Sequence, residues 1–413
     1  MLANPITLKN HFENEKDDLN IPEYLVKITK FSTSLRQAIE YSKIIYDMFV
    51  RRELIKISER TIDNAKLSDL NINGQTIIED SEKELFKLAE KGSFNSSIIK
   101  FDKALKKTID MASAAYKNEE GIVGVPTGLR DLDDRLGGLH KSDLIIIAGR
   151  PGMGKTALAT NIAFNAAKKL QESGKKSSIA FFSLEMSSEQ LARRILSEQA
   201  RISSNDIRRG NLSENDLNNL VEVSKEILEI PLFIDDTPAV NIGTLSSRAR
   251  RLKRKNGLGA IVVDYLQLLR PSKTSRNESR VLEISEITQG LKALAKELNI
   301  PIIALSQLSR QVEQREDKKP QLSDLRESGS IEQDSDVVMF IFREEYYLEK
   351  NAPSPGTAEF IEWQQKMDAV HGQADLLIMK QRHGPTGNIK LSFDANYTRF
   401  GNYISKEQSE NYE

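Results

Sequence analysis

The spacing of hydrophobic positions along the chain changes near residue 120. Before that point apolar side chains recur every three or four residues over 35–55 and 77–89, and this spacing predicts amphipathic helices. Residues 71–74 have turn composition and predict a helical hairpin, and 97–116 predicts a third helix. The polar segment that follows holds three glycines and a proline and predicts a linker.

From residue 143 onward, short apolar runs rich in β-branched residues alternate with helical segments. The apolar runs that predict strands are 143–148, 178–183, 261–269, 301–306, 337–342, 374–380 and 389–393, and the strand in the run 261–269 is expected to end at Asp264. Strands that alternate with helices indicate an α/β fold with a mainly parallel sheet covered on both faces. We therefore expect a partial helical N-terminal domain at 1–95, a linker helix and linker at 96–125, an α/β domain at 126–404 and a tail at 405–413. Residues 349–372 are polar and predict an insertion between strands.

Composition narrows the classes of protein that remain. The net charge of −1 gives no overall basic excess, so any contact with a polyanion must come from local clusters. The chain has no cysteine, which excludes disulfides, cysteine-ligated zinc and a thiol nucleophile. No apolar secretory segment opens the sequence, and no apolar run approaches the ~20 residues that span a bilayer. These features predict a cytoplasmic protein with no membrane contact.

A glycine-rich motif follows the first predicted strand and opens a helix. It consists of Gly149, Arg150, Pro151, Gly152, Met153, Gly154, Lys155 and Thr156, with Ala157 next in the chain. The pattern G-x-x-x-x-G-K-[ST] is that of a P-loop, in which backbone N–H groups point at phosphate oxygens. Lys155 should reach the β- and γ-phosphates of ATP, and the Thr156 hydroxyl should bind Mg²⁺. The competing interpretation, a glycine-rich turn that binds nothing, does not explain why the motif joins a strand to an apolar helix.

Other polar residues stand where predicted strands end. Asp264 ends the run AIVVD and is a candidate second Mg²⁺ contact, of the Walker B type, rather than a helix-capping aspartate. Glu185 follows a strand and could orient the attacking water, or it could simply cap the next helix. Gln307 could sense the γ-phosphate, or it could be a surface glutamine. Lys380 and Arg382 could reach a phosphate bound by a neighbouring subunit, or they could form a solvated basic turn.

Two polar loops could contact nucleic acid. One contains Lys273 and Arg276, and the other contains Arg326 and ends at Gly329 and Ser330. Neither loop holds an aromatic residue, which favours contact with the phosphate backbone over stacking on bases. The strongest basic run, 246–255, has helical spacing and predicts a solvated helix face.

Together these residues resemble the DnaB-type replicative helicases, whose motor is a RecA-like ATPase. The resemblance covers nearly the whole chain and rests on AGRPGMGKT, FFSLEMSSEQLARR, AIVVDYLQLL, ALSQLSRQVEQR, DLRESGSIEQD and KQRHGPTG. It implies that Glu185 is the catalytic glutamate and that Gln307 responds to the γ-phosphate. It also implies that Lys380 and Arg382 act on the neighbouring subunit's nucleotide, with Arg382 as the arginine finger. Asp264 takes the role of the Walker B aspartate.

The same resemblance implies an assembly and its partners. Arg326, Glu327 and Gly329 would contact single-stranded DNA, and the helix at 97–116 would dock on the next subunit. A homohexamer would use ATP and Mg²⁺ to travel 5′ to 3′ on one strand of forked DNA. Primase and a helicase loader are further partners in this family, but the sequence begins partway through the family's N-terminal domain. That departure weakens the expectation of primase contact.

A RecA-type recombinase or repair ATPase is the alternative interpretation. It shares the α/β core but should lack the DLRESGSIEQD loop and the N-terminal hairpin. A binding protein that has lost turnover is disfavoured because all the expected catalytic residues are present. An ABC-type ATPase is disfavoured because no LSGGQ-like signature occurs in the sequence.

Overall fold

The computed structural model describes residues 27, 35–66, 73–90, 100–116, 122–174, 176–271, 280–325 and 329–404. The chain divides into two compact units, Met1–Ser96 and Ser97–Glu413. Within the described ranges, no helix combines the length and the apolar character needed to cross a membrane.

The first unit contains two described helices, α3 (Leu35–Lys66) and α4 (Gly74–Glu90). The Asn73 side chain accepts a hydrogen bond from the Thr76 backbone N–H at 2.8 Å and so starts α4. The hydroxyls of Thr61 on α3 and Ser81 on α4 lie 2.9 Å apart and join the two helices. These contacts confirm the predicted all-α hairpin.

The second unit is α/β. Its strands are β1 (Leu144–Gly149), β2 (Ile179–Ser183), β3 (Leu232–Asp235), β4 (Ala260–Asp264), β5 (Ile302–Gln307), β6 (Val337–Phe342), β7 (Gln373–Gln381), β8 (Gly387–Asp394) and β9 (Arg399–Asn402). Its α-helices are α5 (Phe101–Tyr116), α6 (Arg130–Leu136), α7 (Lys155–Glu172), α8 (Ser188–Ala200), α9 (Ser204–Arg209), α10 (Glu214–Ile227), α11 (Ile242–Asn256), α12 (Arg280–Leu298), α13 (Gly329–Asp334), α14 (Glu344–Lys350) and α15 (Ala358–Val370). Short 3-10 turns are η1 (Leu266–Leu268), η2 (Arg310–Gln314) and η3 (Leu322–Leu325).

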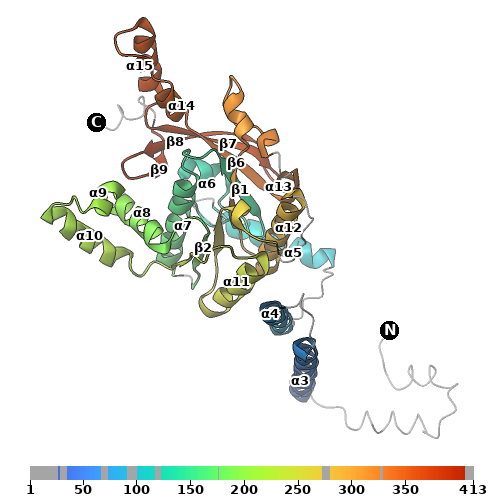
Figure 1. Ribbon diagram of the computed structural model, residues 1–413. Helices are drawn as coiled ribbons and strands as arrows, with labels where there is room; N and C mark the ends of the chain where they lie inside the picture. Colours follow the sequence, from blue (N-terminus) through green and yellow to red (C-terminus); the bar gives the residue numbers. More distant parts are fainter. Residues whose placement is uncertain are drawn as a thin grey trace. The chain divides into compact units, whose positions relative to one another are not determined.

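The nine strands form one sheet in the order β3-β2-β4-β5-β1-β6-β7-β8-β9. In this order, each neighbouring pair from β3 to β6 is parallel. The remaining neighbouring pairs, β6-β7, β7-β8 and β8-β9, are antiparallel. The mainly parallel sheet predicted from the alternation of strands and helices is therefore confirmed. Figure 1 shows α7 and α12 beside this twisted sheet, whereas α10 and α15 extend away from it.

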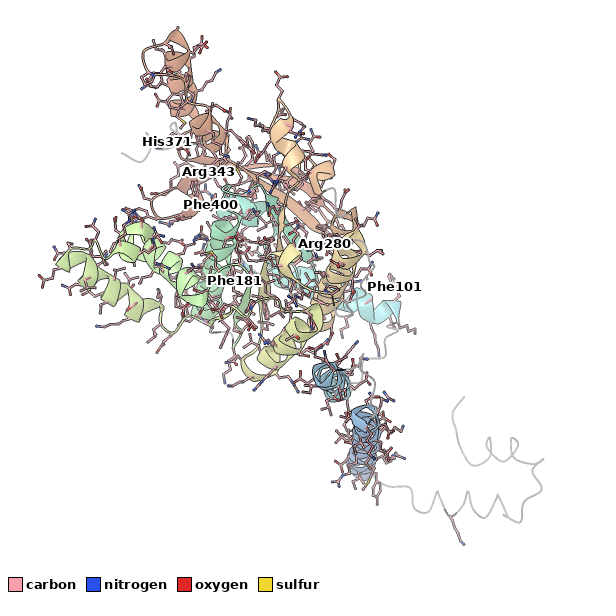
Figure 2. The ribbon with its side chains drawn as sticks, viewed as in Figure 1. Phe101, Phe181, Arg280, Arg343, His371 and Phe400 are labelled. Carbon is pink, nitrogen blue, oxygen red and sulfur yellow. The ribbon has the colours of Figure 1, made fainter. Side chains whose placement is uncertain are left out.

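Both faces of the sheet are covered, as the strand composition requires. All six residues of β1 are buried, and alternate residues of a strand point to opposite faces. Ile145 and Ile147 pack in the same cluster as the apolar side of α7, together with Phe181 of β2, which Figure 2 places within the core. The second covering helix, α12, also contacts β1 and β5 and buries Ile287 and Leu291. The central strands are thus held rigidly, and their carboxyl ends present the polar residues that follow them.

The structure differs from the sequence-based expectation in several elements. The apolar run 261–269 is not strand throughout: β4 ends at Asp264, where the strand end was expected, and the turn η1 follows it. The short strands β3 and β9 were not predicted, because four half-exposed residues carry little periodic signal. The polar insertion at 349–372 lies between strands as expected, but most of it is helical, in α14 and α15.

The basic run 246–255 was predicted as a solvated helix face, and this is wrong in part. It does lie in a helix, α11, but Ser246, Ser247 and Arg250 are buried. Arg250 Nε lies 2.7 Å from the Glu297 carboxylate of α12. The guanidinium therefore clamps α11 to α12, since a buried charge needs a partner.

Candidate functional site

The P-loop forms the sharp turn between β1 and α7. Gly152 and Gly154 have φ of +84° and +95°, a region that side chains with a Cβ rarely adopt. A Cβ on Gly154 would come within 2.8 Å of the Phe400 ring, and one on Gly152 within 2.7 Å of the Tyr346 ring. The positive φ values and the lack of room for a Cβ both require glycine at these two positions. Helix α7 begins directly after the loop, at Lys155.

A pocket of about 320 Å³ opens above this turn. Its lining includes Pro151, Gly152, Gly154, Lys155, Thr156, Ala157, Glu185, Arg194, Tyr265, Gln307, Phe393 and Thr398. The parallel register explains why distant residues meet: Gly149 lies opposite Gln307, and Ser183 lies opposite Asp264. The carboxyl ends of parallel strands share one edge of the sheet, which is where ligands bind in open α/β sheets. The structure thus gathers Glu185 and Gln307 around the P-loop.

Asp264 is the buried carboxylate of the site. Its side chain is hydrogen-bonded to Thr156, and its Oδ2 has no hydrogen-bond partner among the described residues. Burial raises the pKa of Asp264 to about 6, and Glu185 adds to this effect. A buried oxygen without a partner next to a hydroxyl is a ligand set that Mg²⁺ fits. The described residues hold no cluster of three or more His, Cys, Asp or Glu side chains, so phosphate oxygens and water would complete such a site.

Lys155 is largely buried beside these carboxylates. Burial lowers the pKa of Lys155 to about 8, although Asp264 and Glu185 act in the opposite direction. Its Nζ donates to the Arg150 carbonyl at 3.3 Å. Phosphate oxygens would supply the negative charge that stabilises the ammonium form, so the site is electrostatically prepared for a polyanion.

Glu185 does not have the capping role that was the competing interpretation. The N-cap of α8 is Ser187, which forms a capping box with Gln190. Leu184 N–H donates to the Asp264 carbonyl at 2.8 Å and fixes the Glu185 loop against the end of β4. The Glu185 side chain itself is exposed and lines the pocket, where it can reach water.

Arg194 is a residue of this site that the sequence reasoning missed. It lies on α8, lines the pocket and lies within electrostatic range of Asp264 and Glu185. Its Nη1 is buried and has no hydrogen-bond partner among the residues described. A buried guanidinium nitrogen without an acceptor is suited to a phosphate oxygen. In the sequence only the string SSEQLARR indicates an arginine near the site, and the string does not show whether Arg193 or Arg194 lines the pocket.

We expect Arg194→Met to lower kcat/KM for ATP by roughly 10- to 100-fold, since a charge-assisted hydrogen bond to phosphate is lost. Steady-state ATP hydrolysis at several ATP concentrations measures this effect. Arg193→Met is the matched control, because that arginine precedes Arg194 on the same helix and does not line the pocket. Equal kinetics in the two variants would remove Arg194 from the nucleotide site.

Glu198 lies one turn beyond Arg194 on α8 and is buried. Asn161 of α7 donates to its carboxyl group, and Arg399 Nε lies 3.7 Å away. Burial raises the pKa of Glu198 from its ordinary value of 4.5 to about 7. The folded protein therefore binds a proton that the unfolded chain releases. The resulting contribution to the free energy of unfolding is complete below pH 4.5 and is lost as the pH rises through about 7.

Glu198→Gln cannot ionise but keeps an oxygen that accepts from Asn161. Relative to the unmodified protein, its Tm should therefore rise between about pH 5 and about pH 8. Thermal melting across this range measures the effect, with Glu222→Gln on the exposed face of α10 as the control. Parallel curves for Glu198→Gln and the unmodified protein would contradict the assignment.

Several residues of the motif and of the predicted trans-acting pair lie elsewhere. The side chains of Arg150 and Met153 do not line the pocket; Met153 is buried, and its sulfur accepts from Arg343 N–H at 3.3 Å. Lys380 Nζ donates to the Ser335 carbonyl at 2.8 Å, and Arg382 donates to the Gln333 carbonyl at 2.7 Å. Neither cation reaches the pocket of its own chain.

The predicted DNA contacts Lys273, Arg276, Arg326 and Glu327 lie outside the described residues. Gly329 is described: it is exposed and is the first residue of α13. At the carboxyl end of α13, the Gln333 and Ser335 carbonyls accept hydrogen bonds from Arg382 and Lys380. This short helix therefore lies between the predicted DNA loop, which precedes it in the chain, and the two basic residues at the end of β7.

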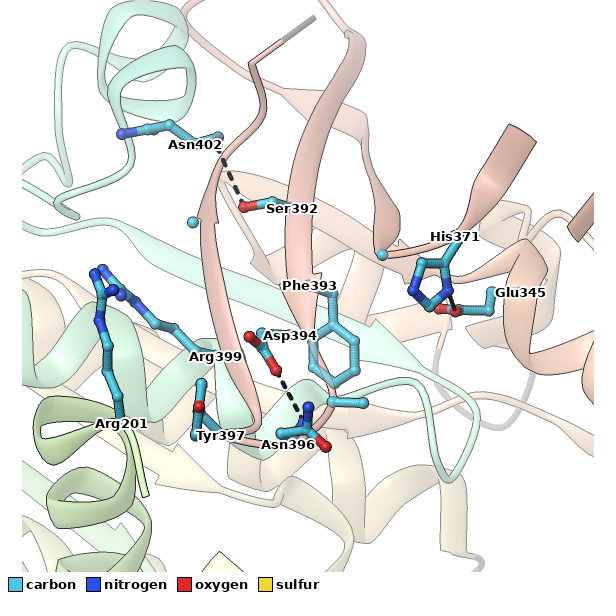
Figure 3. Close-up of a pocket in the computed structure, with 13 residues that line it drawn as sticks. Arg201, Glu345, His371, Ser392, Phe393, Asp394, Asn396, Tyr397, Arg399 and Asn402 are labelled. Atoms are coloured by element: carbon cyan, nitrogen blue, oxygen red, sulfur yellow. Dashed lines mark hydrogen bonds and ion pairs between the residues drawn. The ribbon is translucent and has the colours of Figure 1, made fainter. Parts of the chain in front are cut away.

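A larger hollow of about 710 Å³ adjoins the nucleotide pocket. It includes Arg201 and Arg399 on one side and the His371–Glu345 pair on another, with Phe393 between them (Figure 3). Phe393 lines both hollows, but no residue of the P-loop lines the larger one. The phosphate chemistry therefore belongs to the smaller pocket.

Comparisons with known proteins agree with this geometry. The family model described as the DnaB-like helicase C terminal domain matches residues 124–402. The replicative DNA helicase DnaB of Rickettsia conorii is 47% identical over 100% of this chain and 84% of that protein. The replicative DNA helicase DnaC of Bacillus subtilis is 37% identical over 92% of this chain and 78% of that protein.

Two solved structures also resemble this chain. A structure of a DnaB-like replicative helicase and its interactions with primase superposes with a TM-score of 0.67 at 30% identity. It covers 97% of this chain, and the match spans 88% of that chain. A second solved structure, that of an ATPase domain, superposes with a TM-score of 0.64 at 35% identity, over 74% of this chain and 99% of its own.

Proposed function

The chain belongs to the family of DnaB-like helicases, and from this premise we propose that it is an ATP-dependent replicative DNA helicase. It would unwind duplex DNA at the replication fork by 5′-to-3′ movement of a ring on single-stranded DNA. The observation that carries this proposal is the meeting of the P-loop with Glu185, Asp264 and Gln307 at one edge of the sheet. We place this activity in the cytoplasm, as expected from the sequence.

The roles of the site residues follow from their positions. Backbone N–H groups of the P-loop and the Lys155 ammonium bind the phosphates of ATP, and Arg194 adds a second cation of the same chain. Thr156 and Asp264 would hold Mg²⁺, which when bound neutralises charge on the phosphate oxygens. Glu185, exposed at the pocket wall, orients the attacking water and accepts its proton.

Lys380 and Arg382 complete the site of a neighbouring subunit in this proposal. Both hydrogen-bond within their own chain to carbonyls of α13 and the residues after it, away from their own nucleotide pocket. The Arg382 side chain is 46% exposed, so it can reach outward. Arg382 Nε also lies 3.6 Å from Asp336 Oδ1 of its own chain, so Arg382 would exchange these contacts for a neighbour's phosphate when it acts between subunits.

Assembly into a hexamer has support in the helical region. In the single chain, α3 exposes Ile44, Ile45, Met48, Ile55 and Ile62, each between 51% and 66%. On α5, Phe101, Leu105 and Ile109 are exposed by 77%, 47% and 59% and lie four residues apart, on one side of the helix. Apolar surface of this extent favours burial against another chain. We propose that α5 docks on the next subunit and that α3 and α4 contribute to a collar.

The partners follow from the same assignment. Single-stranded and forked DNA would run past the loops at 271–280 and 325–329, whose cations bind phosphates without reading bases. One structural relative was solved with interactions to primase, and we propose primase and a helicase loader as further partners of this chain.

We also propose that the helical N-terminal domain ends at residue 95 and that the α/β motor domain begins at residue 126, with the linker helix and linker between them.

A polarity assay separates this proposal from a RecA-type recombinase. Duplexes that carry only a 5′ tail, only a 3′ tail, or both tails as a fork would be incubated with ATP and Mg²⁺. Unwinding that requires the 5′ tail is the expected result. Strand exchange between homologous DNA molecules, without unwinding of the forks, would favour the recombinase instead.

A further inference from the structure

We infer that Arg150, Glu313 and Arg315 are positioning residues that tie the P-loop to the loop proposed to hold single-stranded DNA. Through them the state of the nucleotide is transmitted to the DNA contact within one subunit. The inference rests on the proposed function, because it requires both an ATP site and a DNA loop. It gives a role to an arginine that the motif alone places among the phosphate ligands.

Arg150 connects two parts of the chain by separate atoms. Its backbone carbonyl accepts a hydrogen bond from Lys155 Nζ at 3.3 Å. Its guanidinium, only 7% exposed, points away from the nucleotide pocket: Nη1 donates to the Leu308 carbonyl at 2.8 Å, and Nε donates to Glu313 at 3.0 Å. Leu308 directly follows Gln307, which lines the pocket. The P-loop is therefore bonded to the segment that leaves the site behind Gln307.

The two ends of that segment, 308–325, are joined by hydrogen bonds to Asp324. Ser309 N–H donates to the Asp324 carbonyl at 3.0 Å, and Arg315 Nη2 donates to the Asp324 carboxylate at 2.9 Å. Gln321 N–H donates to the same carboxylate at 2.7 Å. Bonds at both ends make the segment move as a unit rather than absorb displacement in a slack loop. Asp324 is two residues before Arg326, the first residue of this loop that is proposed to contact DNA.

The ion pair between Arg150 and Glu313 holds the P-loop firmly to the segment 308–325. Arg150 is buried and Glu313 is 40% exposed, so their ion pair is partly shielded from solvent. Removal of the Glu313 charge would leave a buried guanidinium held mainly by one carbonyl. The P-loop would then shift against 308–325 at little cost, and movement at the phosphates would no longer reach Asp324.

The test measures the coupling between nucleotide and DNA in the full chain carrying Glu313→Gln. The affinity for a labelled oligodeoxythymidine is determined with a non-hydrolysable ATP analogue and with ADP, and ATP hydrolysis is determined with and without the oligonucleotide. The ratio of the two affinities should fall about 10-fold, and because coupling between binding sites is reciprocal, DNA should raise the affinity for the ATP analogue correspondingly less. DNA stimulation of hydrolysis should fall as well, because the P-loop would no longer be tied to the segment before the DNA loop. Hydrolysis without DNA should stay within about 2-fold of the unmodified protein, because Glu313 does not touch the pocket.

Two further variants sharpen the test. Arg315→Gln cuts the tie at Asp324 instead of at the P-loop and should lower the same ratio. Glu316→Gln removes an exposed charge from the same segment and should leave the ratio unchanged. A normal ratio in both Glu313→Gln and Arg315→Gln, even with a lowered Tm, would overturn the inference and leave these residues as stabilising contacts. If the unmodified protein shows no effect of DNA on ATP hydrolysis, the proposed function itself fails, and the inference fails with it.

Discussion

Lys155→Ala should lower ATP hydrolysis by roughly 100- to 1,000-fold or more, because a preorganised charge at the phosphates is removed. The ammonium is largely buried in the pocket wall next to Asp264 and Glu185, and burial lowers its pKa to about 8. A phosphate-release assay at saturating ATP measures the change. DNA unwinding should be lost with it, since the motor would have no source of energy.

Lys168→Ala is the control for this variant. Lys168 is exposed on the same helix, α7, more than three turns away from the P-loop. It should keep the hydrolysis rate of the unmodified protein. Turnover that survives in Lys155→Ala would mean that the phosphates bind elsewhere.

Arg382→Ala should leave nucleotide binding nearly intact but lower hydrolysis by about 10³- to 10⁵-fold, the range found for arginine fingers. The physical reason is that Arg382 does not line the pocket of its own chain and would act on charge that develops in a neighbour's site. Binding of a fluorescent nucleotide and phosphate release, measured side by side, separate the two steps. His383→Ala, which changes the next residue of the same turn, should retain hydrolysis.

Mixing variants shows whether the site is shared. In a ring assembled from equal amounts of Arg382→Ala and Glu185→Ala subunits, about a quarter of the interfaces would combine an intact Glu185 with an intact Arg382. Hydrolysis should therefore reappear on mixing, although each variant alone is inactive. No recovery, in rings shown to contain both variants, would mean that Arg382 acts within its own subunit.

Much of the site was predictable because it depends on local rules. A P-loop between a buried strand and a helix, and polar residues directly after parallel strands, must meet at one edge of the sheet. The structure places Glu185, Asp264 and Gln307 there together with Lys155, and the roles assigned to them stay predictions.

The remaining features depend on contacts between residues distant in sequence. Arg194 lines the pocket from α8, which packs against α7, and the sequence does not distinguish it from Arg193. Arg150 lies in the phosphate motif, yet its guanidinium turns toward Leu308 and Glu313. The basic run of α11 looked solvated, but Glu297 draws Arg250 into the interior. Burial of a charge follows from its partner, and the partner cannot be identified from spacing.

The most direct test of the account combines DNA unwinding with particle mass. A forked duplex would be incubated with ATP and Mg²⁺, and the mass of the protein in the same solution would be measured by light scattering. We expect unwinding by a particle of about six subunits, because in the proposed ring each ATP site would take residues from two neighbouring chains. Unwinding by a monomer, or a hexamer that hydrolyses ATP but never separates the fork, would contradict it.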